Sequence, residues 1–253
     1  MVLVSWGTFF TIGLLLIPLI YLQRFLQREI QSIFLLITRQ PEISMALFSI
    51  IFLPGVVIHE ISHFLMATLL GVRTGRFSIL PKKIEGGRIR LGYVETASTD
   101  FVRDALIGAA PLISGGIFVA YVGASRLGLN NVLSIISLGQ LNAINLGIQS
   151  VLAQPDFWLW FYLIFVVSNT MFPSASDRRA WLPLILVMII ILGLILLIGA
   201  GPWIISQLGS TIKTALDAII MVLGITALID LVLLPPTYFI RRIISRILGL
   251  QVV

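Results

Sequence analysis

The chain has 253 residues, of which 58% are hydrophobic and 11% charged, and its net charge is +6. Soluble domains carry about 25% charged residues, so this composition is typical of a polytopic membrane protein, which we expect to form a single domain over 1–253. We expect no nucleic-acid partner, because the basic residues lie between apolar runs and form no continuous basic face. The chain has no cysteine, which excludes disulfides and thiolate ligands, so a metal site must use imidazole and carboxylate groups.

Six apolar runs approach the roughly 20 residues that a membrane-spanning helix needs. They cover Leu3–Leu22, Ile43–Leu70, Ala105–Ala124, Phe157–Phe172, Trp181–Ala200 and Ala215–Leu234. We therefore predict an all-α polytopic membrane protein with about six transmembrane helices. A further stretch, Asn130–Ala153, is interrupted by Asn and Gln side chains, which favours an amphipathic helix that is interfacial or partly inserted.

The distribution of positive charge predicts how the spans are oriented. With six spans, one side of the membrane carries Arg73, Arg76, Lys82, Lys83, Arg88, Arg90, Arg103, Arg178, Arg179, Arg241, Arg242 and Arg246, and the other carries Arg24, Arg28, Arg39, Arg126 and Lys213. Because the more basic side is normally cytoplasmic, we predict that both termini lie in the cytoplasm. A seventh span would abolish this bias, which favours six.

A short β element is predicted between the second and third spans. The stretch Arg88–Val94 alternates with the period of two residues that is typical of a strand, and Glu85–Gly87 is suited to a turn after the shorter run Phe77–Leu80. We therefore expect a small β-hairpin near residues 76–95, on the cytoplasmic side.

The sequence "HEISH" lies within the second apolar run and contains the only two histidines of the chain. On a helix, His59 and His63 project from one face, where two imidazoles can hold one cation, and Glu60 is placed to act as general base on a metal-bound water. Ionisable residues within a span are costly and usually functional. A competing interpretation is a polar patch in which these side chains only satisfy one another.

Tetrahedral zinc held by two histidines needs a third protein ligand and leaves one position for water. The six-span arrangement places His59 and His63 in the cytoplasmic half of the second span. Two aspartates lie at that level, Asp177 just past the fourth span and Asp230 inside the sixth. Spacing alone does not choose between them.

Three separated segments together resemble the site-2 protease family of intramembrane zinc metalloproteases. They are "HEISH", "GAAPLISG" at Gly108–Gly115, and "SNTMFPSASD" at Ser168–Asp177, in which Asn169 precedes Asp177 by eight residues. The matches bracket about half of the chain. The resemblance implies one zinc ion per chain with Asp177 as third ligand, and Asp230 is kept as the reserve. The chain departs from the family in having two arginines directly after Asp177, where glycines are usual.

The resemblance also implies an activity, the hydrolysis of a peptide bond in or near the transmembrane segment of a single-pass membrane protein. The strand beside the active site and one asparagine are then expected to bind the substrate backbone; these residues are Arg88, Ile89, Arg90, Leu91, Gly92, Tyr93, Val94 and Asn169. The strand could equally be an anchor sheet, and the asparagine a helix-packing amide. An alternative function is a non-catalytic metal-binding membrane protein, either a transporter or a protease-derived scaffold.

Overall fold

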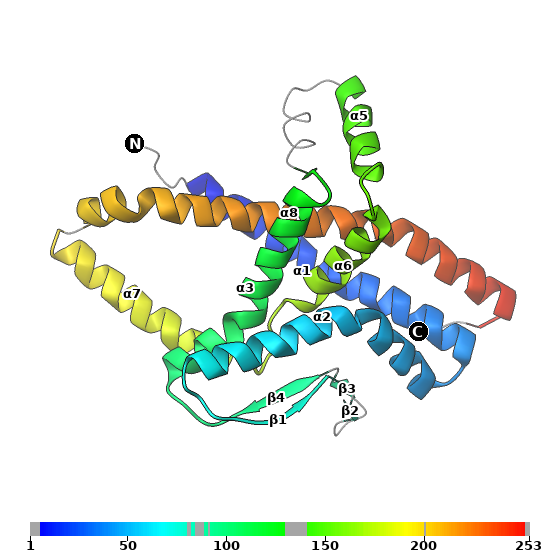
Figure 1. The fold of residues 1–253 in the computed structure, drawn as a ribbon, viewed down its shortest axis with the longest axis horizontal. Helices are drawn as coiled ribbons and strands as arrows, with labels where there is room; N and C mark the ends of the chain where they lie inside the picture. The colour runs from blue at the N-terminus through cyan, green and yellow to red at the C-terminus, as the bar shows by residue number, and fades with distance from the viewer. Residues whose placement is uncertain are drawn as a thin grey trace.

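A computed structural model describes residues 6–79, 82–83, 89–90, 92–129, 141–199 and 201–250 (Figure 1). Its helices are α1 (Trp6–Thr38), α2 (Pro41–Leu69), α3 (Phe101–Ser125), α5 (Leu141–Leu152), α6 (Phe157–Thr170), α7 (Trp181–Leu197) and α8 (Gly201–Leu248). Its strands are β1 (Thr74–Ser78), β2 (Lys82–Lys83), β3 (Ile89–Arg90) and β4 (Tyr93–Thr96). The predicted fold is confirmed as mainly helical with a small antiparallel β element, which follows α2 in the chain.

Four helices, α1, α2, α3 and α8, are long and apolar enough to cross a bilayer. The pair α5 and α6 adds a fifth candidate if it is counted as one span, although the two helices are bent by 96° at the break between them. Helix α7 is apolar throughout but has 17 residues. The chain is therefore of the membrane-spanning type, whereas the predicted number of six spans is not confirmed. Of the predicted amphipathic stretch, α5 covers the last part, and residues 130–140 lie outside the described residues.

Helices α1 and α8 pack along each other and run in the same direction (Figure 1). Gln23 of α1 and Asp230 of α8 both reach the C-terminal end of α6, and further along the pair Glu29 of α1 forms an ion pair with Arg241 of α8. Six successive crossings would make the first and last spans antiparallel, which is not how α1 and α8 lie. The side on which each terminus lies depends on which helices cross the bilayer completely. The location of both termini on one side therefore stays a prediction.

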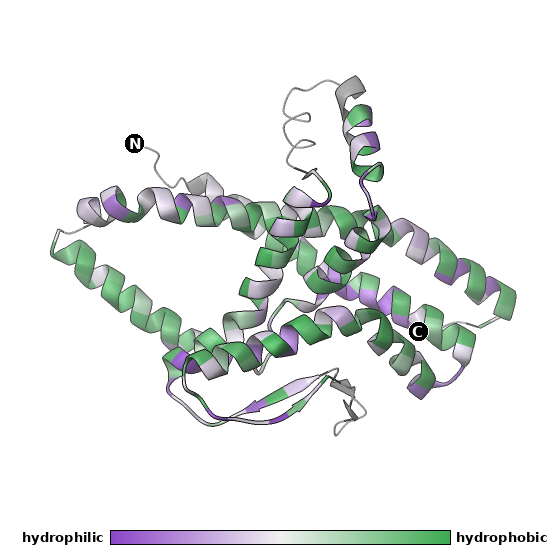
Figure 2. Cartoon of the chain, in the orientation of Figure 1, coloured by the Kyte–Doolittle hydropathy of each residue, from purple (hydrophilic) through white to green (hydrophobic). Residues whose placement is uncertain are grey.

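The buried core lies where α1, α2, α3, α6 and α8 meet. It contains Leu26, Phe52, Val119, Ile164 and Ile225. Outside this core the helices remain apolar, and Figure 2 shows α7 as mostly hydrophobic. None of the residues of α7 is buried. Apolar side chains that face outwards over whole helices are expected where lipid replaces water as the solvent.

The β element consists of two short antiparallel pairs. In the first, β1 pairs with β4, with Thr74 opposite Thr96 and Ser78 opposite Tyr93, and the register shifts between Thr74 and Phe77. In the second, β2 pairs with β3, with Lys83 opposite Ile89. The predicted strands began and ended at other residues, and the predicted turn at 85–87 lies outside the described residues.

Local capping explains where α3 begins. The Asp100 carboxylate accepts hydrogen bonds from the backbone N–H groups of Val102 and Arg103, at 3.1 and 3.0 Å. These N–H groups would otherwise lack a partner in the first helical turn. The bond from Arg103 is the main reason why the pKa of the Asp100 carboxyl lies below its ordinary value. The cap fixes the start of the helix that carries Gly108 and Pro111 to the site.

Candidate metal centre

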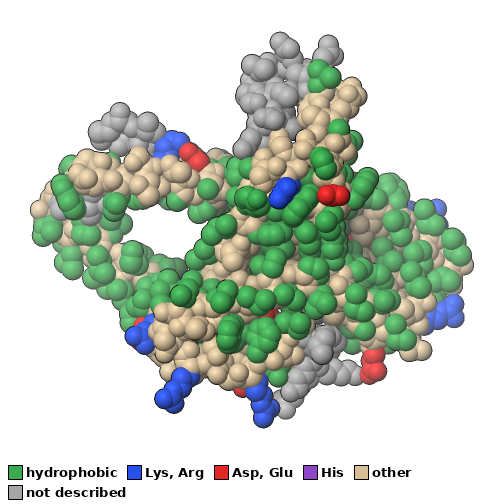
Figure 3. All heavy atoms as spheres, viewed as in Figure 1, with side chains coloured by type: hydrophobic (Ala, Val, Ile, Leu, Met, Phe, Trp, Pro, Cys, Tyr) green, Lys and Arg blue, Asp and Glu red, His purple; other side chains and the backbone are tan. Residues whose placement is uncertain are grey.

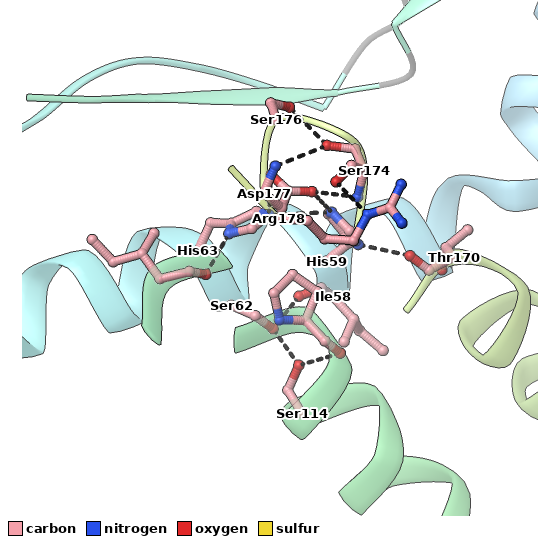
Figure 4. A network of polar contacts seen from close by, with 12 residues as sticks. Ile58, His59, Ser62, His63, Ser114, Thr170, Ser174, Ser176, Asp177 and Arg178 are labelled. Atoms are coloured by element: carbon pink, nitrogen blue, oxygen red, sulfur yellow. Dashed lines mark hydrogen bonds and ion pairs between the residues drawn. The ribbon is translucent and has the colours of Figure 1, made fainter. Parts of the chain in front are cut away.

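Three metal-binding side chains converge where α2 meets the loop that follows α6. His63 Nε2 lies 3.6 Å from Asp177 Oδ1, and His59 Nε2 lies 3.9 Å from Asp177 Oδ2. The two Nε2 atoms are 3.2 Å apart, and the three ligand atoms all lie within 4.8 Å of one another. Figure 4 shows the histidines and the aspartate grouped together. This group can hold a metal ion.

The other ring nitrogen of each histidine contacts a backbone carbonyl. His59 Nδ1 lies 2.7 Å from the carbonyl oxygen of Thr170, and His63 Nδ1 lies 2.8 Å from that of Ile107. A carbonyl oxygen can only accept, so each Nδ1 carries the proton and each Nε2 keeps the lone pair that binds a metal. Such outer partners fix the tautomer and the ring orientation of metal-binding histidines. The residues present therefore fit a cation held by two imidazoles and a carboxylate.

Both carbonyls are available because the local sequence removes their usual helical partners. Thr170 is the last residue of α6, where carbonyl oxygens have no N–H four residues ahead within the helix. Ile107 lies four residues before Pro111, inside α3, and proline has no N–H to donate. The segment that the sequence marks as "GAAPLISG" thus supplies an acceptor for His63.

Asp177 lies in the loop 171–180 between α6 and α7. Its Oδ2 accepts the backbone N–H of Ser174 at 2.7 Å, which orients the carboxylate. The loop approaches α3 so closely that a Cβ atom on Gly108 would lie 2.0 Å from the carbonyl oxygen of Asp177. Arg178 directs its Nε to the Ser174 carbonyl oxygen at 3.3 Å, and among the described residues it forms no ion pair with Asp177.

Glu60, the predicted general base, is buried, with 7% of its surface exposed, and it lines the same cavity as the histidines. The β element covers it. A Cβ atom on Gly92 would lie 2.7 Å from Glu60 Cγ and 2.8 Å from Oε1, so a larger residue at position 92 would force the Glu60 side chain to move. The arrangement places one carboxylate beside the metal-binding group and keeps it from bulk solvent.

The cavity around the metal-binding group has a volume of about 620 Å³. Gly92, Val94 and Thr96 line it, as expected for alternate residues that share one face of a strand. Of the other predicted substrate-binding residues on the β element, Tyr93 is described and half-buried, Ile89 and Arg90 are described only as backbone in β3, and Arg88 and Leu91 lie outside the described residues. The predicted strand thus reaches the site through Gly92 and Val94.

Asn169 and Asp230 form a buried pair beside the cavity. The Nδ2 atom of Asn169 donates to Asp230 Oδ1 at 2.8 Å and to the Phe165 carbonyl oxygen at 3.0 Å. Its Oδ1 atom is buried without a hydrogen-bond partner among the described residues. Asp230 is fully buried and is not a member of the metal-binding group. Asn169 also lines the cavity, and its predicted contact with substrate stays a prediction.

Several residues of the site were not predicted. Proline at position 111 was a sequence signal for the free Ile107 carbonyl, since the missing bond always falls four residues earlier. Ser62 and Ser114 are hydrogen-bonded to each other across α2 and α3, and Gln27 of α1 lines the cavity. No local pattern indicates these contacts, because they join helices far apart in the sequence.

Comparison of the chain with protein-family models, with curated proteins and with solved structures returned no match.

Proposed function

We propose that this protein is an intramembrane zinc metalloprotease that hydrolyses a peptide bond in or near the transmembrane segment of a membrane-protein substrate. The observation that carries the proposal is the convergence of His59, His63 and Asp177, with both Nε2 lone pairs free for a metal, in one cavity with the buried Glu60. Two imidazoles and one carboxylate are a ligand set of hydrolytic zinc sites with an open fourth position.

In this reaction each protein group has a defined task. A bound zinc ion supplies Lewis acidity, which polarises the scissile carbonyl and lowers the pKa of a water molecule. Glu60 takes the proton from the attacking water and passes it to the departing amine. The Thr170 and Ile107 carbonyls hold the two imidazoles in their metal-binding tautomer.

The substrate must be unwound at the scissile bond, because a helical peptide group is shielded by its own hydrogen bonds. The wall made by Gly92, Val94 and Thr96 offers a surface along which an extended segment can lie. Asn169 also lines the cavity, and its Oδ1 has no hydrogen-bond partner among the described residues, so a change of its rotamer would present an acceptor to a substrate N–H. We propose that this end of the molecule faces the cytoplasm, because the hairpin region and the residues directly after Asp177 are rich in Lys and Arg.

The test is the paired substitution of two glutamates on α2. Glu60→Gln should retain about one zinc per chain, measured by elemental analysis, and lose cleavage by about 10²- to 10⁴-fold, the usual contribution of a general base. Glu42→Gln changes an exposed glutamate in the first turn of the same helix and should cleave normally.

The cleavage assay uses reconstituted full-length protein and single-pass substrates that co-purify with the Glu60→Gln variant. Cleavage that survives Glu60→Gln undiminished would exclude the mechanism. Zinc binding without any cleavage of the trapped proteins by the unaltered chain would favour the non-catalytic alternative.

A further inference from the structure

A second cavity, of about 570 Å³, lies between α1, α2 and the later part of α8. Its charged and polar lining residues are Arg28, Glu29, Gln31, Ser32, Ser44 and Arg241. Among the described residues, none lines both this cavity and the one that holds the metal-binding group. Gln27 faces the metal cavity while its neighbours Arg28 and Glu29 face the second, so α1 forms a wall between them.

The second cavity carries an excess of positive charge. The Glu29 carboxylate, which is buried, is bound by the Nε of Arg241. The hydrogen bond to Glu29 uses the Nε of Arg241, and among the described residues Arg28 forms no ion pair. The lining thus carries two guanidinium groups and one carboxylate, and Arg242 and Arg246 follow on the same helix. Guanidinium groups with unused N–H donors are suited to phosphate.

The depth of the cavity in the membrane follows from the parallel course of α1 and α8. The apolar run of α1 ends at Leu22, and that of α8 ends at Leu234. Because the two helices run in the same direction, their polar segments begin at the same end of the molecule. Figure 2 shows hydrophilic turns on both helices there, and Figure 3 shows basic side chains at this end. The guanidinium of Arg241 also lies 5.6 Å from the ring centre of Tyr238, and tyrosine is enriched where the bilayer meets water.

We propose that this cavity binds the phosphate of an anionic phospholipid headgroup through Arg28 and Arg241. The proposal does not depend on the metal centre. Free phosphate shares the same chemistry, but the cavity lies at the level where both apolar runs end, and the apolar side chains of Leu35 and Met45 line it. Those side chains offer acyl chains an apolar surface next to the guanidinium groups.

The experiment measures lipid binding to the full-length protein in a neutral detergent. The probes are phosphatidylglycerol, phosphatidylcholine and inorganic phosphate, and native mass spectrometry counts the bound molecules. We expect phosphatidylglycerol to bind tightly, and phosphatidylcholine and inorganic phosphate to bind much more weakly. Arg28→Gln should weaken it about fivefold, the effect of one basic residue near an anionic lipid. Arg241→Gln alone would leave Glu29 buried and unpaired, so the informative second variant is the double change Glu29→Gln with Arg241→Gln.

The matched control is Arg126→Gln, an exposed arginine at the end of α3 that stacks over Trp160 and lies outside the cavity. An equal loss with this control would mean general attraction of acidic lipid to a basic protein, and would overturn the proposal. Inorganic phosphate that binds as tightly as phosphatidylglycerol would overturn the assignment to lipid. Unchanged binding in both cavity variants would exclude the site.

Discussion

At the scale of single residues, the metal centre depends on two backbone carbonyls. Neither histidine has a carboxylate as outer partner; Thr170 and Ile107 accept the Nδ1 protons instead. A carbonyl that is free of its helical bond is a fixed acceptor, because the backbone cannot rotate away as a side chain can. The two imidazoles are therefore oriented by carbonyl groups that the end of α6 and the proline of α3 leave without a helical partner.

The choice of third ligand can be tested at two aspartates. Asp177→Asn should weaken zinc binding by at least about 100-fold, more than the loss typical of an outer-shell partner, because it removes a charged ligand. Asp230→Asn should leave the affinity unchanged, since Asp230 pairs with Asn169 and lies outside the metal-binding group. Competition with a chromophoric chelator measures both. Equal losses in the two variants would contradict the assignment of Asp177.

The role of Pro111 can be tested by giving Ile107 a helical partner. Pro111→Ala adds an N–H that competes with His63 for the Ile107 carbonyl, so zinc binding should weaken about tenfold. Alanine strengthens a helix, so the loss would not reflect unfolding. Pro18→Ala, inside α1 and away from the site, is the control and should bind zinc normally. An unchanged zinc affinity of Pro111→Ala would show that the free carbonyl is not needed.

At the scale of elements, the site depends on how closely helices approach. The loop after α6 rests directly on α3 at Gly108, and α2 meets α6 at Gly55, where a Cβ atom would lie 2.4 Å from the Val166 carbonyl oxygen. Small residues allow backbones in membrane helices to come this near. The loop position, and with it the Asp177 carboxylate, is therefore set by α3.

Two glycines on α3 provide a matched test of this packing. Gly108→Ala would place Cβ 2.0 Å from the Asp177 carbonyl oxygen, so the loop must move. Gly116→Ala meets nothing within 4 Å and raises helix propensity equally. We expect at least about tenfold weaker zinc binding for Gly108→Ala, in line with the cost of overpacking, and none for Gly116→Ala. Equal affinities, measured by chelator competition, would mean that the loop is not held by α3.

At the scale of the whole molecule, the parallel packing of α1 and α8 bears on topology. If both helices cross the membrane completely, their N-terminal ends lie on one side and their C-terminal ends on the other. Arg24, Arg28 and Arg39 then lie on the same side as Arg241, Arg242 and Arg246, while Lys213 lies on the other. The positive-inside rule places the more basic ends of α1 and α8 in the cytoplasm.

The absence of native cysteine makes the topology directly testable. Gly7→Cys and Ile247→Cys, each introduced alone near one end, can be labelled with a membrane-impermeant maleimide in intact and in permeabilised cells. From the parallel packing we expect labelling from opposite sides, with residue 247 cytoplasmic. Cytoplasmic labelling at both positions would instead support the prediction from six spans, and would mean that α1 and α8 do not both cross completely.

The sequence by itself determined the features that depend on neighbours along the chain. Apolar runs indicated a membrane protein, the spacing of His59 and His63 placed two imidazoles on one helix face, and alternation near Val94 indicated a strand. The third metal ligand and the second cavity depend instead on burial and on contacts between residues far apart in the sequence. Only the tertiary structure separated Asp177 from Asp230, because both lie at a suitable level and only packing shows which carboxylate faces the histidines. Likewise, the second cavity exists because α1 and α8 lie side by side, and the order of residues along the chain does not specify which distant helices pair.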